Sequence, residues 1–286
     1  MTSLGESWLG VPELPEVETI ARELDERLPG KRIATTRVIR PDVLRVVGAD
    51  DLVERLRGRE VLRVWRRAKS VVIDLSGAQF LIVQPRFTGA ILVRDQDGLV
   101  LEDDPHATVV WELEGDGSFF YRDVRRLGTV HLVDEEGLRE FDARLGPEPL
   151  DPAFTHTRLS GILRASRSAI KKVLMDQRCV AGVGNIYANE ALWRSGLDPS
   201  RPALSLEPDE VGRLHDELVD VLEASIEARG TTFRDYRDPS NRSGSFAAQL
   251  MAYGRGGLQC RRCATRLVET HTIDGRSTVF CYRCQR

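Results

Sequence analysis

The chain has 286 residues, of which 41% are hydrophobic and 30% are charged. This composition is enough for two domains with ordinary cores, and it excludes a wholly disordered protein. No stretch approaches the roughly 18–20 apolar residues of a membrane span. Residues 1–10 also lack the basic start and the apolar run of a secretion signal, so we expect a cytoplasmic protein.

The charges are unevenly distributed along the chain. Residues 231–286 contain 10 arginines and 4 acidic residues, a local charge of +6, so the net charge of −3 leaves −9 for the rest. A basic end on an acidic chain indicates a module that binds a polyanion such as nucleic acid. A solvated arginine-rich face would have the same composition, so charge alone does not decide between the two.

The first half of the sequence predicts one helix followed by a β-sandwich or a flattened barrel. After Pro15, apolar residues recur with helical spacing up to Leu28, and Pro29-Gly30 ends the pattern. Short strand-like runs follow, with turn-forming Gly and Asp between them. These runs are 70–75, 80–84, 90–93, 108–113, 118–121 and 129–133.

From about residue 146 the pattern becomes helical, and the chain ends in a cysteine-rich tail. The helical segments that we predict are 162–167, 169–176, 186–195 and 208–229. Residues 230–257 are rich in Gly, Ser, Arg and Asn and indicate a long functional loop. The fold class that we predict is therefore α+β and multi-domain. Its predicted parts are an extension (1–11), a β-sandwich (12–145), a helical domain (146–230), a loop (231–257) and a zinc finger (258–286).

The cysteines of the tail have the spacing of a metal site. Cys260 and Cys263 form one CxxC pair, and Cys281 and Cys284 form a second one after 17 intervening residues. Two such pairs offer four thiolates at tetrahedral geometry, and residues 267–279 between them can form a β-hairpin. We predict one Zn²⁺ here, which is structural because all four coordination positions are protein ligands. A redox pair or coincidence are the alternatives.

A glycine-rich turn precedes the predicted helix 186–195. Gly182 and Gly184 allow a tight turn, and a helix N-terminus binds phosphate well. Asn185 can cap this helix and donate to a phosphate oxygen, as in a helix–two-turn–helix DNA clamp. An ordinary helix connection is the alternative.

Three motifs together resemble the formamidopyrimidine-DNA glycosylase family of bacteria. They are PELPEVET at 12–19, GVGNIYANE at 182–190 and the terminal cysteine pairs. Shorter matches occur in the family's order: RRAK at 66–69, LGPEPL at 145–150, YGR at 253–255 and GRSTVFC at 275–281. The resemblance spans almost everything after residue 11. It implies a base-excision-repair enzyme that removes oxidised purines (8-oxoguanine, formamidopyrimidines) from double-stranded DNA and then cleaves the strand at the abasic site.

The resemblance also implies the catalytic residues. In the family the proline is the N-terminal residue, and its secondary amine attacks C1′ of the damaged nucleoside to form a Schiff base, followed by β- and δ-elimination. This role falls on Pro12, with Glu13 as the acid/base and Glu16 in support. Lys69 and Arg276 complete the predicted catalytic set. A purely capping role of Pro12 and Glu13 at the first helix is the alternative.

Further positions match residues that hold the DNA. Lys69, Asn185 and Arg276 match contacts to phosphates around the lesion. Arg125 and Leu127 match the probe of the opposite base and a wedge, Phe87 matches the family's methionine wedge, and His106 aligns with a family histidine. Ordinary packing is the alternative for Phe87 and Leu127. We expect a monomer that needs no diffusible cofactor.

Several positions depart from the family's pattern. QPRFTG (84–89) stands where HLGMSG is common, and DVRRL (123–127) where DPRRF is common. The segment 231–251 resembles the loop that closes over flipped purines, but Ser245 replaces its usual aromatic residue. Two other functions therefore stay open: an endonuclease VIII-like glycosylase for oxidised pyrimidines, and a DNA-binding homologue without catalysis.

Residues 1–11 conflict with the mechanism that the resemblance implies. A proline inside a chain has an amide nitrogen, which is not nucleophilic. Val11 stands where the family's initiator methionine belongs, and the valine codon GUG can also start translation. We therefore expect the working protein to begin at Pro12, with processing as a variant of this hypothesis. An intact mass that includes residues 1–10 in the natively expressed protein would contradict both.

Overall fold

The computed structural model describes residues 11–94, 104–115, 117–232 and 236–286. The predicted extension, up to residue 10, lies outside them. The chain divides into two compact units, which we call the β unit and the helical unit. Of the described residues, those within 11–143 and 229–245 form the β unit, and 144–228 and 246–286 form the helical unit. Among the helices that the structure describes, none is long and apolar enough to cross a membrane.

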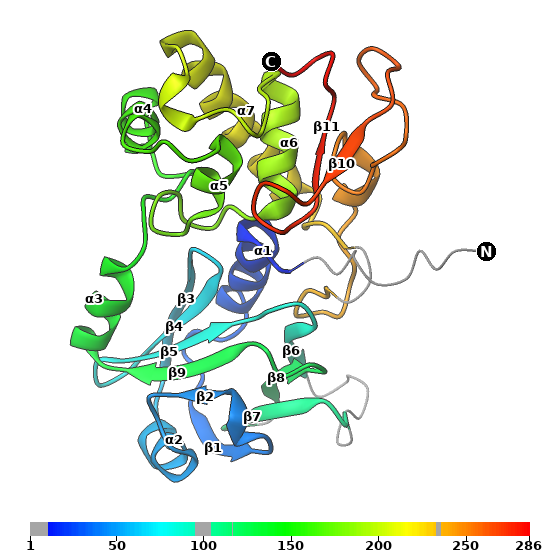
Figure 1. The fold of residues 1–286 in the computed structure, drawn as a ribbon. Helices are drawn as coiled ribbons and strands as arrows, with labels where there is room; N and C mark the ends of the chain where they lie inside the picture. Colours follow the sequence, from blue (N-terminus) through cyan, green and yellow to red (C-terminus); the bar gives the residue numbers. More distant parts are fainter. Residues whose placement is uncertain (1–10, 95–103, 116, 233–235) are drawn as a thin grey trace. The chain divides into compact units, whose positions relative to one another are not determined.

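In its described residues, the β unit is built from two sheets, three α-helices and one short 3-10 helix, Pro41–Val43 (Figure 1). One sheet has four strands in the order β1-β7-β8-β6, and the other has five in the order β2-β9-β5-β4-β3. All neighbouring strands are antiparallel except β2 and β9. The strands are β1 (Ile33–Val38), β2 (Leu44–Arg45), β3 (Val61–Arg67), β4 (Ser70–Leu75), β5 (Gln79–Gln84), β6 (Gly89–Arg94), β7 (Ala107–Leu113), β8 (Ser118–Asp123) and β9 (Thr129–Val133). The predicted β-sandwich with a leading helix is thereby confirmed.

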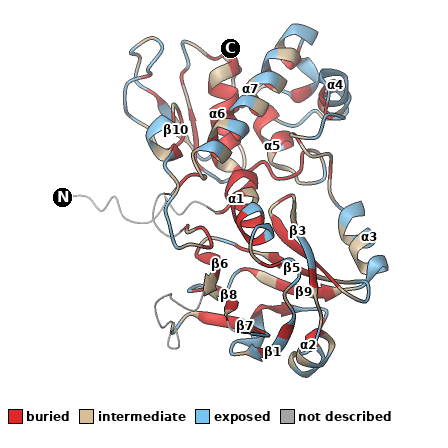
Figure 2. Ribbon diagram, turned by 180° about the vertical axis from the view of Figure 1, so that it is seen from behind, coloured by how far each residue is buried: buried red, intermediate tan, exposed pale blue. Residues whose placement is uncertain are grey.

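The α-helices of the β unit are α1 (Leu14–Asp25), α2 (Ala49–Leu56) and α3 (Glu135–Ala143). Helix α1 is buried along most of its length (Figure 2), because Val17, Ile20 and Leu24 enter the core that the two sheets share. Burial of such side chains contributes about 1.5–3 kcal/mol each. This packing fixes the position of the chain segment that leads into α1.

The helical unit holds four α-helices and a small β-hairpin. The helices are α4 (His156–Arg164), α5 (Ile170–Met175), α6 (Asn185–Ser195) and α7 (Pro208–Glu227). Strands β10 (Val268–Thr270) and β11 (Thr278–Phe280) pair antiparallel, as the hairpin prediction requires. A core of Trp193, Ala252, Leu267 and Val279 joins α6 to this hairpin.

The predicted elements agree with the structure except at some ends. Two strands, β4 and β9, have the predicted bounds. The predicted helix 162–167 begins earlier, at His156, because Thr155 caps it by accepting a hydrogen bond from the Arg158 N–H. Helices α2 and α3 and strands β1 and β3 were not predicted from the sequence.

Candidate active site and nucleic-acid interface

The start of α1 forms a buried group of acidic side chains beside Pro12. Glu13 is the N-cap of the helix, and it exchanges hydrogen bonds with Glu16 in a capping box. The Glu13 N–H donates to Oε2 of Glu16 at 2.9 Å. Pro12 is buried, and Glu13 and Glu16 are 3% and 1% exposed. The three residues that the family resemblance assigns to the reaction thus share one helix terminus, screened from water.

Glu16 also reaches a distant segment of the same unit. Its Oε1 accepts from the Thr231 N–H at 2.6 Å, and its backbone carbonyl accepts from the Tyr236 hydroxyl at 3.2 Å. Gly230 makes this approach feasible, because it has φ +86° and a Cβ there would lie 3.0 Å from Cγ and Oε1 of Glu16. Glu16 therefore links the helix terminus to the start of the predicted lesion loop.

We expect Gly230→Ala to displace Glu16 and to destabilise the β unit. An alanine at this φ costs about 1–2 kcal/mol, and the contact with Glu16 adds to that cost. The measurement is the free energy of unfolding in urea. Gly161→Ala is the matched control, because its Cβ meets nothing within 4 Å in α4, so this variant should be neutral or more stable. Equal stability of the two variants would contradict the expectation.

Lys69 lies in the tight turn between β3 and β4. Arg67 pairs with Ser70 across the turn, and Ala68 has φ +53°. Arg66, whose side chain is 7% exposed, donates to the Ala68 carbonyl at 3.1 Å and pairs with Glu18 of α1 at 2.8 Å. Burial raises the pKa of Glu18, but the charges and hydrogen bonds of Arg66 and Arg22 bring it below its ordinary value. The turn that carries Lys69 is thereby tied to α1.

Two loops of the β unit present the predicted wedge and probe residues. The Arg125 guanidinium lies over the Phe87 ring, 4.6 Å from its centroid, and Leu127 is 40% exposed. Buried Asp123 joins the loops, since its carboxylate accepts from the Thr88 hydroxyl at 2.7 Å and from the Gly128 N–H at 2.9 Å. Phe87 and Arg125 therefore form one surface feature.

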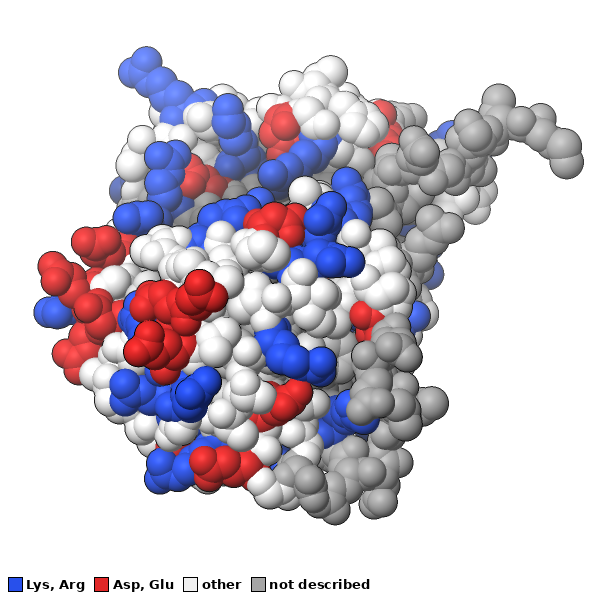
Figure 3. Space-filling view, turned by 90° about the horizontal axis from the view of Figure 1, so that it is seen from below, with Lys and Arg blue, Asp and Glu red and all other residues white. Residues whose placement is uncertain are grey.

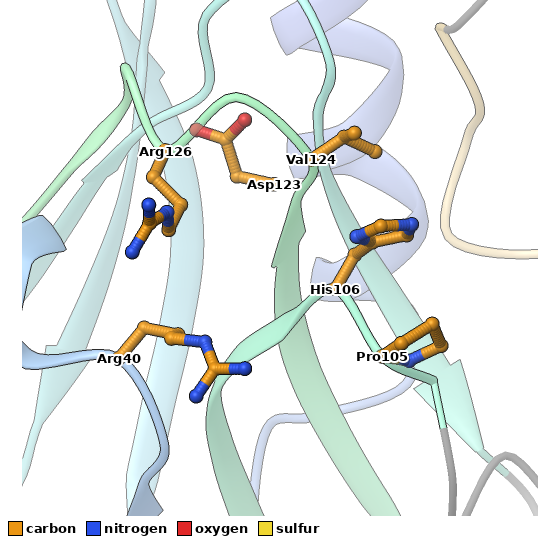
Figure 4. Close-up of a pocket in the computed structure, with 6 residues that line it drawn as sticks. All are labelled: Arg40, Pro105, His106, Asp123, Val124 and Arg126. Carbon is orange, nitrogen blue, oxygen red and sulfur yellow. The ribbon is translucent and has the colours of Figure 1, made fainter.

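His106 lines a pocket of about 310 Å³ in the β unit. Figure 4 shows the guanidinium groups of Arg40 and Arg126 on one side of this pocket and the His106 ring on the other. Arg126 also pairs with Asp42 at 3.1 Å. Arginine groups in a polar concavity suit a phosphate. The sequence reasoning missed Arg40 and Arg126, because neither is set apart from the other arginines by its spacing.

Positively and negatively charged side chains are not separated from each other on the face of the molecule shown in Figure 3. On the face shown in Figure 3, arginine and lysine groups are interspersed with acidic groups among the residues that the figure colours.

In the helical unit, Gln177 holds the glycine-rich turn in place. Its side-chain oxygen accepts from the Gly182 N–H at 2.9 Å, and its amide donates to the Val183 carbonyl at 2.8 Å. The expectation that Asn185 caps α6 is wrong. The N-cap is Gly184, with extended φ and ψ, and Asn185 is the first helical residue. Its side chain accepts from Asn189 at 3.2 Å, so it stands at the helix terminus without capping it.

The hairpin that carries Arg276 is anchored to α5 and α6. Lys171 is fully buried, and its ammonium donates to the Ser277 carbonyl at 3.0 Å and to the Thr278 hydroxyl at 2.7 Å. The Asn189 side-chain oxygen accepts from the Val279 N–H at 2.7 Å. These contacts hold Ser277, Thr278 and Val279, which directly follow Arg276. The backbone of Arg276 therefore has a fixed position within this unit.

Buried Glu190 orders the segment before the cysteines. Its carboxylate accepts from the N–H groups of Met251, Ala252 and Tyr253, each at 2.8 Å. Burial raises the pKa of Glu190, and these three N–H groups act in the opposite direction. The carboxylate thus accepts hydrogen bonds from three consecutive backbone N–H groups, in place of backbone carbonyl groups.

We expect Glu190→Gln to lower the stability of the helical unit by about 1–3 kcal/mol, the usual cost of an unsatisfied buried group. The NH₂ group of the glutamine would face at least one backbone N–H group, from which it cannot accept a hydrogen bond. Urea unfolding measures the effect, with Asp220→Asn on the exposed side of α7 as the control for loss of one negative charge. A change no larger than that of the control would refute the role of Glu190.

The four tail cysteines lie together. Each pair of their sulfur atoms is within 4.8 Å, and Cys260 and Cys281 are buried. Backbone N–H groups of Arg262 and Cys263 point to the Cys260 sulfur, and those of Arg283 and Cys284 point to Cys281. Such N–H groups stabilise thiolates, so the four residues can hold one metal ion.

Two histidines that have no metal-ligand spacing in the sequence also lie together. His156 and His215 both contact Oδ1 of Asp216, at 2.7 Å and 2.9 Å. Hydrogen bonds from the two rings lower the pKa of Asp216. Although the ligand atoms lie within 4.8 Å of one another, these hydrogen bonds already account for the arrangement, and we assign no metal to it.

Comparisons with known proteins agree over nearly the whole chain. Residues 11–130 match the formamidopyrimidine-DNA glycosylase N-terminal domain, and residues 145–237 match the formamidopyrimidine-DNA glycosylase H2TH domain. The formamidopyrimidine-DNA glycosylase of Moorella thermoacetica is 44% identical over 263 residues, 90% of this chain and 93% of the relative.

Solved structures give the same result. The MutM (Fpg) protein of Thermus thermophilus is 37% identical with a TM-score of 0.84, over 96% of this chain and 98% of that one. Wild-type Fpg of Lactococcus lactis, solved in complex with DNA containing N7-benzyl-Fapy-dG, is 30% identical with a TM-score of 0.87. That match covers 96% of this chain and all of the other.

Proposed function

Because the chain belongs to the formamidopyrimidine-DNA glycosylase family, we propose that it excises oxidised purines from duplex DNA and then cleaves the strand at the abasic site. The observation that carries this proposal is the buried group of Pro12, Glu13 and Glu16 at the start of α1. Relatives that are solved with lesion-containing DNA support the choice of substrate.

In the proposed reaction, the Pro12 nitrogen attacks C1′ of the damaged nucleoside. The bond from C1′ to the base breaks, its electron pair leaves with the base, and the base takes up one proton while the Pro12 nitrogen loses its own. Glu13 then protonates O4′ as the sugar ring opens and a C1′=N Schiff base forms. Loss of a C2′ proton expels the 3′ phosphate, and loss of a C4′ proton expels the 5′ phosphate.

This chemistry requires that Pro12 has a free secondary amine, so the active form in the proposal begins at Pro12. An α-amine has a pKa of roughly 8, so an appreciable neutral fraction exists at neutral pH. Glu16 holds the helix terminus against Thr231 and so positions both catalytic residues.

For DNA binding, we propose that Lys69, Asn185 and Arg276 contact the phosphates around the lesion. The pocket of Arg40, His106 and Arg126 takes a further phosphate. Phe87, Arg125 and Leu127 fill the space that a flipped nucleotide leaves in the duplex. Binding through several phosphates should weaken steeply with salt.

We also propose that the four cysteines hold one structural Zn²⁺. A site with four cysteine ligands has no open coordination position, so the ion supplies no chemistry to the reaction. It would order the hairpin and thereby the backbone of Arg276.

Borohydride trapping tests the proposed function. The chain begun at Pro12 and the 286-residue chain are each incubated with a duplex that carries 8-oxoguanine opposite cytosine. A covalent complex with the Pro12 form alone is the expected result. A duplex with an oxidised pyrimidine is the comparison substrate, and preferential trapping on it would overturn the lesion assignment. DNA binding with no trapping on either duplex would favour a non-catalytic homologue.

A further inference from the structure

Two buried carboxylates, Glu23 on α1 and Asp238 in the segment after α7, share the same arginines. Arg229 donates to both, at 2.5 Å to Oε2 of Glu23 and 2.5 Å to Oδ2 of Asp238. Arg242 also contacts both, at 3.4 Å and 3.2 Å. The two acidic side chains are 7% and 1% exposed, whereas those of Arg229 and Arg242 are 39% and 58% exposed, so buried carboxylates pair here with partly exposed arginines within the β unit.

Asp238 closes a compact turn, residues 238–242, and the turn contains two members of this network, Asp238 and Arg242. Its Oδ1 accepts from the Arg242 N–H at 2.8 Å, and its own N–H donates to the Arg242 carbonyl at 3.0 Å. Inside the turn, the Ser240 hydroxyl bonds to Glu23 and accepts from Arg27 at 2.7 Å. The Pro239 carbonyl accepts from Val93 of β6 at 3.0 Å. The turn is therefore held by α1 on one side and by a sheet edge on the other.

Both anchors of this segment lie on one face of α1. Glu16, which binds the Thr231 N–H, and Glu23, which binds the turn 238–242, are seven residues apart, and residues i and i+7 share a helix face. Two turns of helix, about 10.5 Å, separate them. The described residues of the segment are thus attached twice to the helix that begins beside Pro12 and Glu13.

We propose that Glu23 and Asp238 are positioning residues, which hold residues 229–232 and 236–242 along α1 and so set the geometry in which the damaged base is bound. This inference rests on the proposed function and on the resemblance of the segment 231–251 to the loop that closes over flipped purines. Elimination at an abasic site involves no base, so the network should matter for base excision and much less for strand cleavage.

We expect the network to fix the orientation of the segment relative to α1 and to contribute little to the stability of the fold. Ion pairs of this kind contribute little to the stability of the fold, because water competes for the partly exposed guanidinium groups and burial of the carboxylates has a desolvation cost. A planar guanidinium that bonds two carboxylates does, however, fix the angle between the groups that carry them. Arg229 bonds one carboxylate of the helix and one of the segment, so it fixes the segment relative to the helix.

The test compares two single-turnover rates in the chain begun at Pro12. One is base release from a duplex with 8-oxoguanine, and the other is strand cleavage of the same duplex with a preformed abasic site. We expect Glu23→Gln and Asp238→Asn to slow base release by roughly tenfold to a hundredfold, the cost of misplacing a binding group by about 1 Å. Strand cleavage should fall less than about threefold. Glu26→Gln, at the exposed residue that follows α1 as its C-cap and with the same charge change, should alter neither rate.

Hydrogen exchange supplies a readout that does not depend on activity. In Glu23→Gln, the amides of Thr231 and Arg242 should exchange at least tenfold faster, while those of the core strand β4 stay protected. Parallel loss of both rates, or unchanged base release with faster exchange, would overturn the positioning role. Failure of the unsubstituted protein to act on either duplex would instead overturn the proposed function.

Discussion

Glu13→Gln, in a chain that begins at Pro12, should slow formation of the Schiff base on 8-oxoguanine DNA by about 10²–10⁴-fold, the usual contribution of a positioned acid or base. In the proposed mechanism the Glu13 carboxyl group protonates O4′ when the sugar ring opens. The amide group of glutamine is not acidic enough to supply this proton. Single-turnover kinetics with saturating enzyme measure the chemical step without product release.

The fold should survive this substitution, which makes the result interpretable. A glutamine oxygen can still accept from the Glu16 N–H, and the Glu13 N–H still donates to the Glu16 carboxylate, so the capping box persists. The melting temperature should therefore stay close to that of the unsubstituted chain. Glu26→Gln, at the exposed C-cap that follows the same helix, is the charge-matched control. A rate of Schiff-base formation, measured by borohydride trapping, within tenfold of the unsubstituted protein would remove Glu13 from the proposed mechanism.

Much of the fold could be predicted because most strands of the β unit have apolar residues on both faces. Strand β4 is buried at all six positions, and its bounds follow from the sequence. Helix α3 has no buried residue, so no apolar periodicity marks it. Strand β3 buries only Val61 and Val64 and otherwise carries exposed or half-buried residues, three of them arginine, which hides it in the sequence. Periodicity reports burial, and elements that bury little give little signal.

The candidate site was predicted where local sequence specifies local structure. The spacing of the cysteine pairs was enough to predict them as metal ligands. The family motif was enough to predict the role of residues 12–16. The partners of these residues were not predictable, because they lie far away in sequence. Glu16 meets Thr231 across 215 residues, and Lys171 meets Thr278 across 107. Arg40 and Arg126 join His106 only when β1, β7 and β8 pair.

The segment after α7 shows the same limit most clearly. Its composition predicts a long loop, yet residues 236–245 belong to the β unit and hold a turn closed by Asp238. Glycine, serine and arginine are typical of loops, but the carboxylates that order these residues come from α1 and from within the turn. A loop composition therefore does not imply a loosely held segment.

Cys281→Ala should abolish binding of the metal ion and unfold the hairpin while the β unit stays folded. Cys281 is fully buried at the base of β11, and the strands of this hairpin have only three residues each. Isolated two-stranded hairpins are at best marginally stable, whereas zinc binding contributes about 10–16 kcal/mol in zinc-finger peptides. Colorimetric zinc release should fall from one ion per chain to none.

Loss of the ion should also weaken DNA binding, because Arg276 follows the hairpin's backbone. Fluorescence anisotropy with a duplex carrying an uncleavable abasic-site analogue measures this, and we expect a loss at least as large as that of Arg276→Ala. Cys281→His is the matched variant, since a set of three cysteines and one histidine still binds zinc and should restore much of the affinity. Cys179→Ala controls for removal of a thiol outside the cluster. Affinity that persists after the zinc is lost would mean that Lys171 and Asn189 suffice to hold the hairpin, and that the ion is not needed to position Arg276.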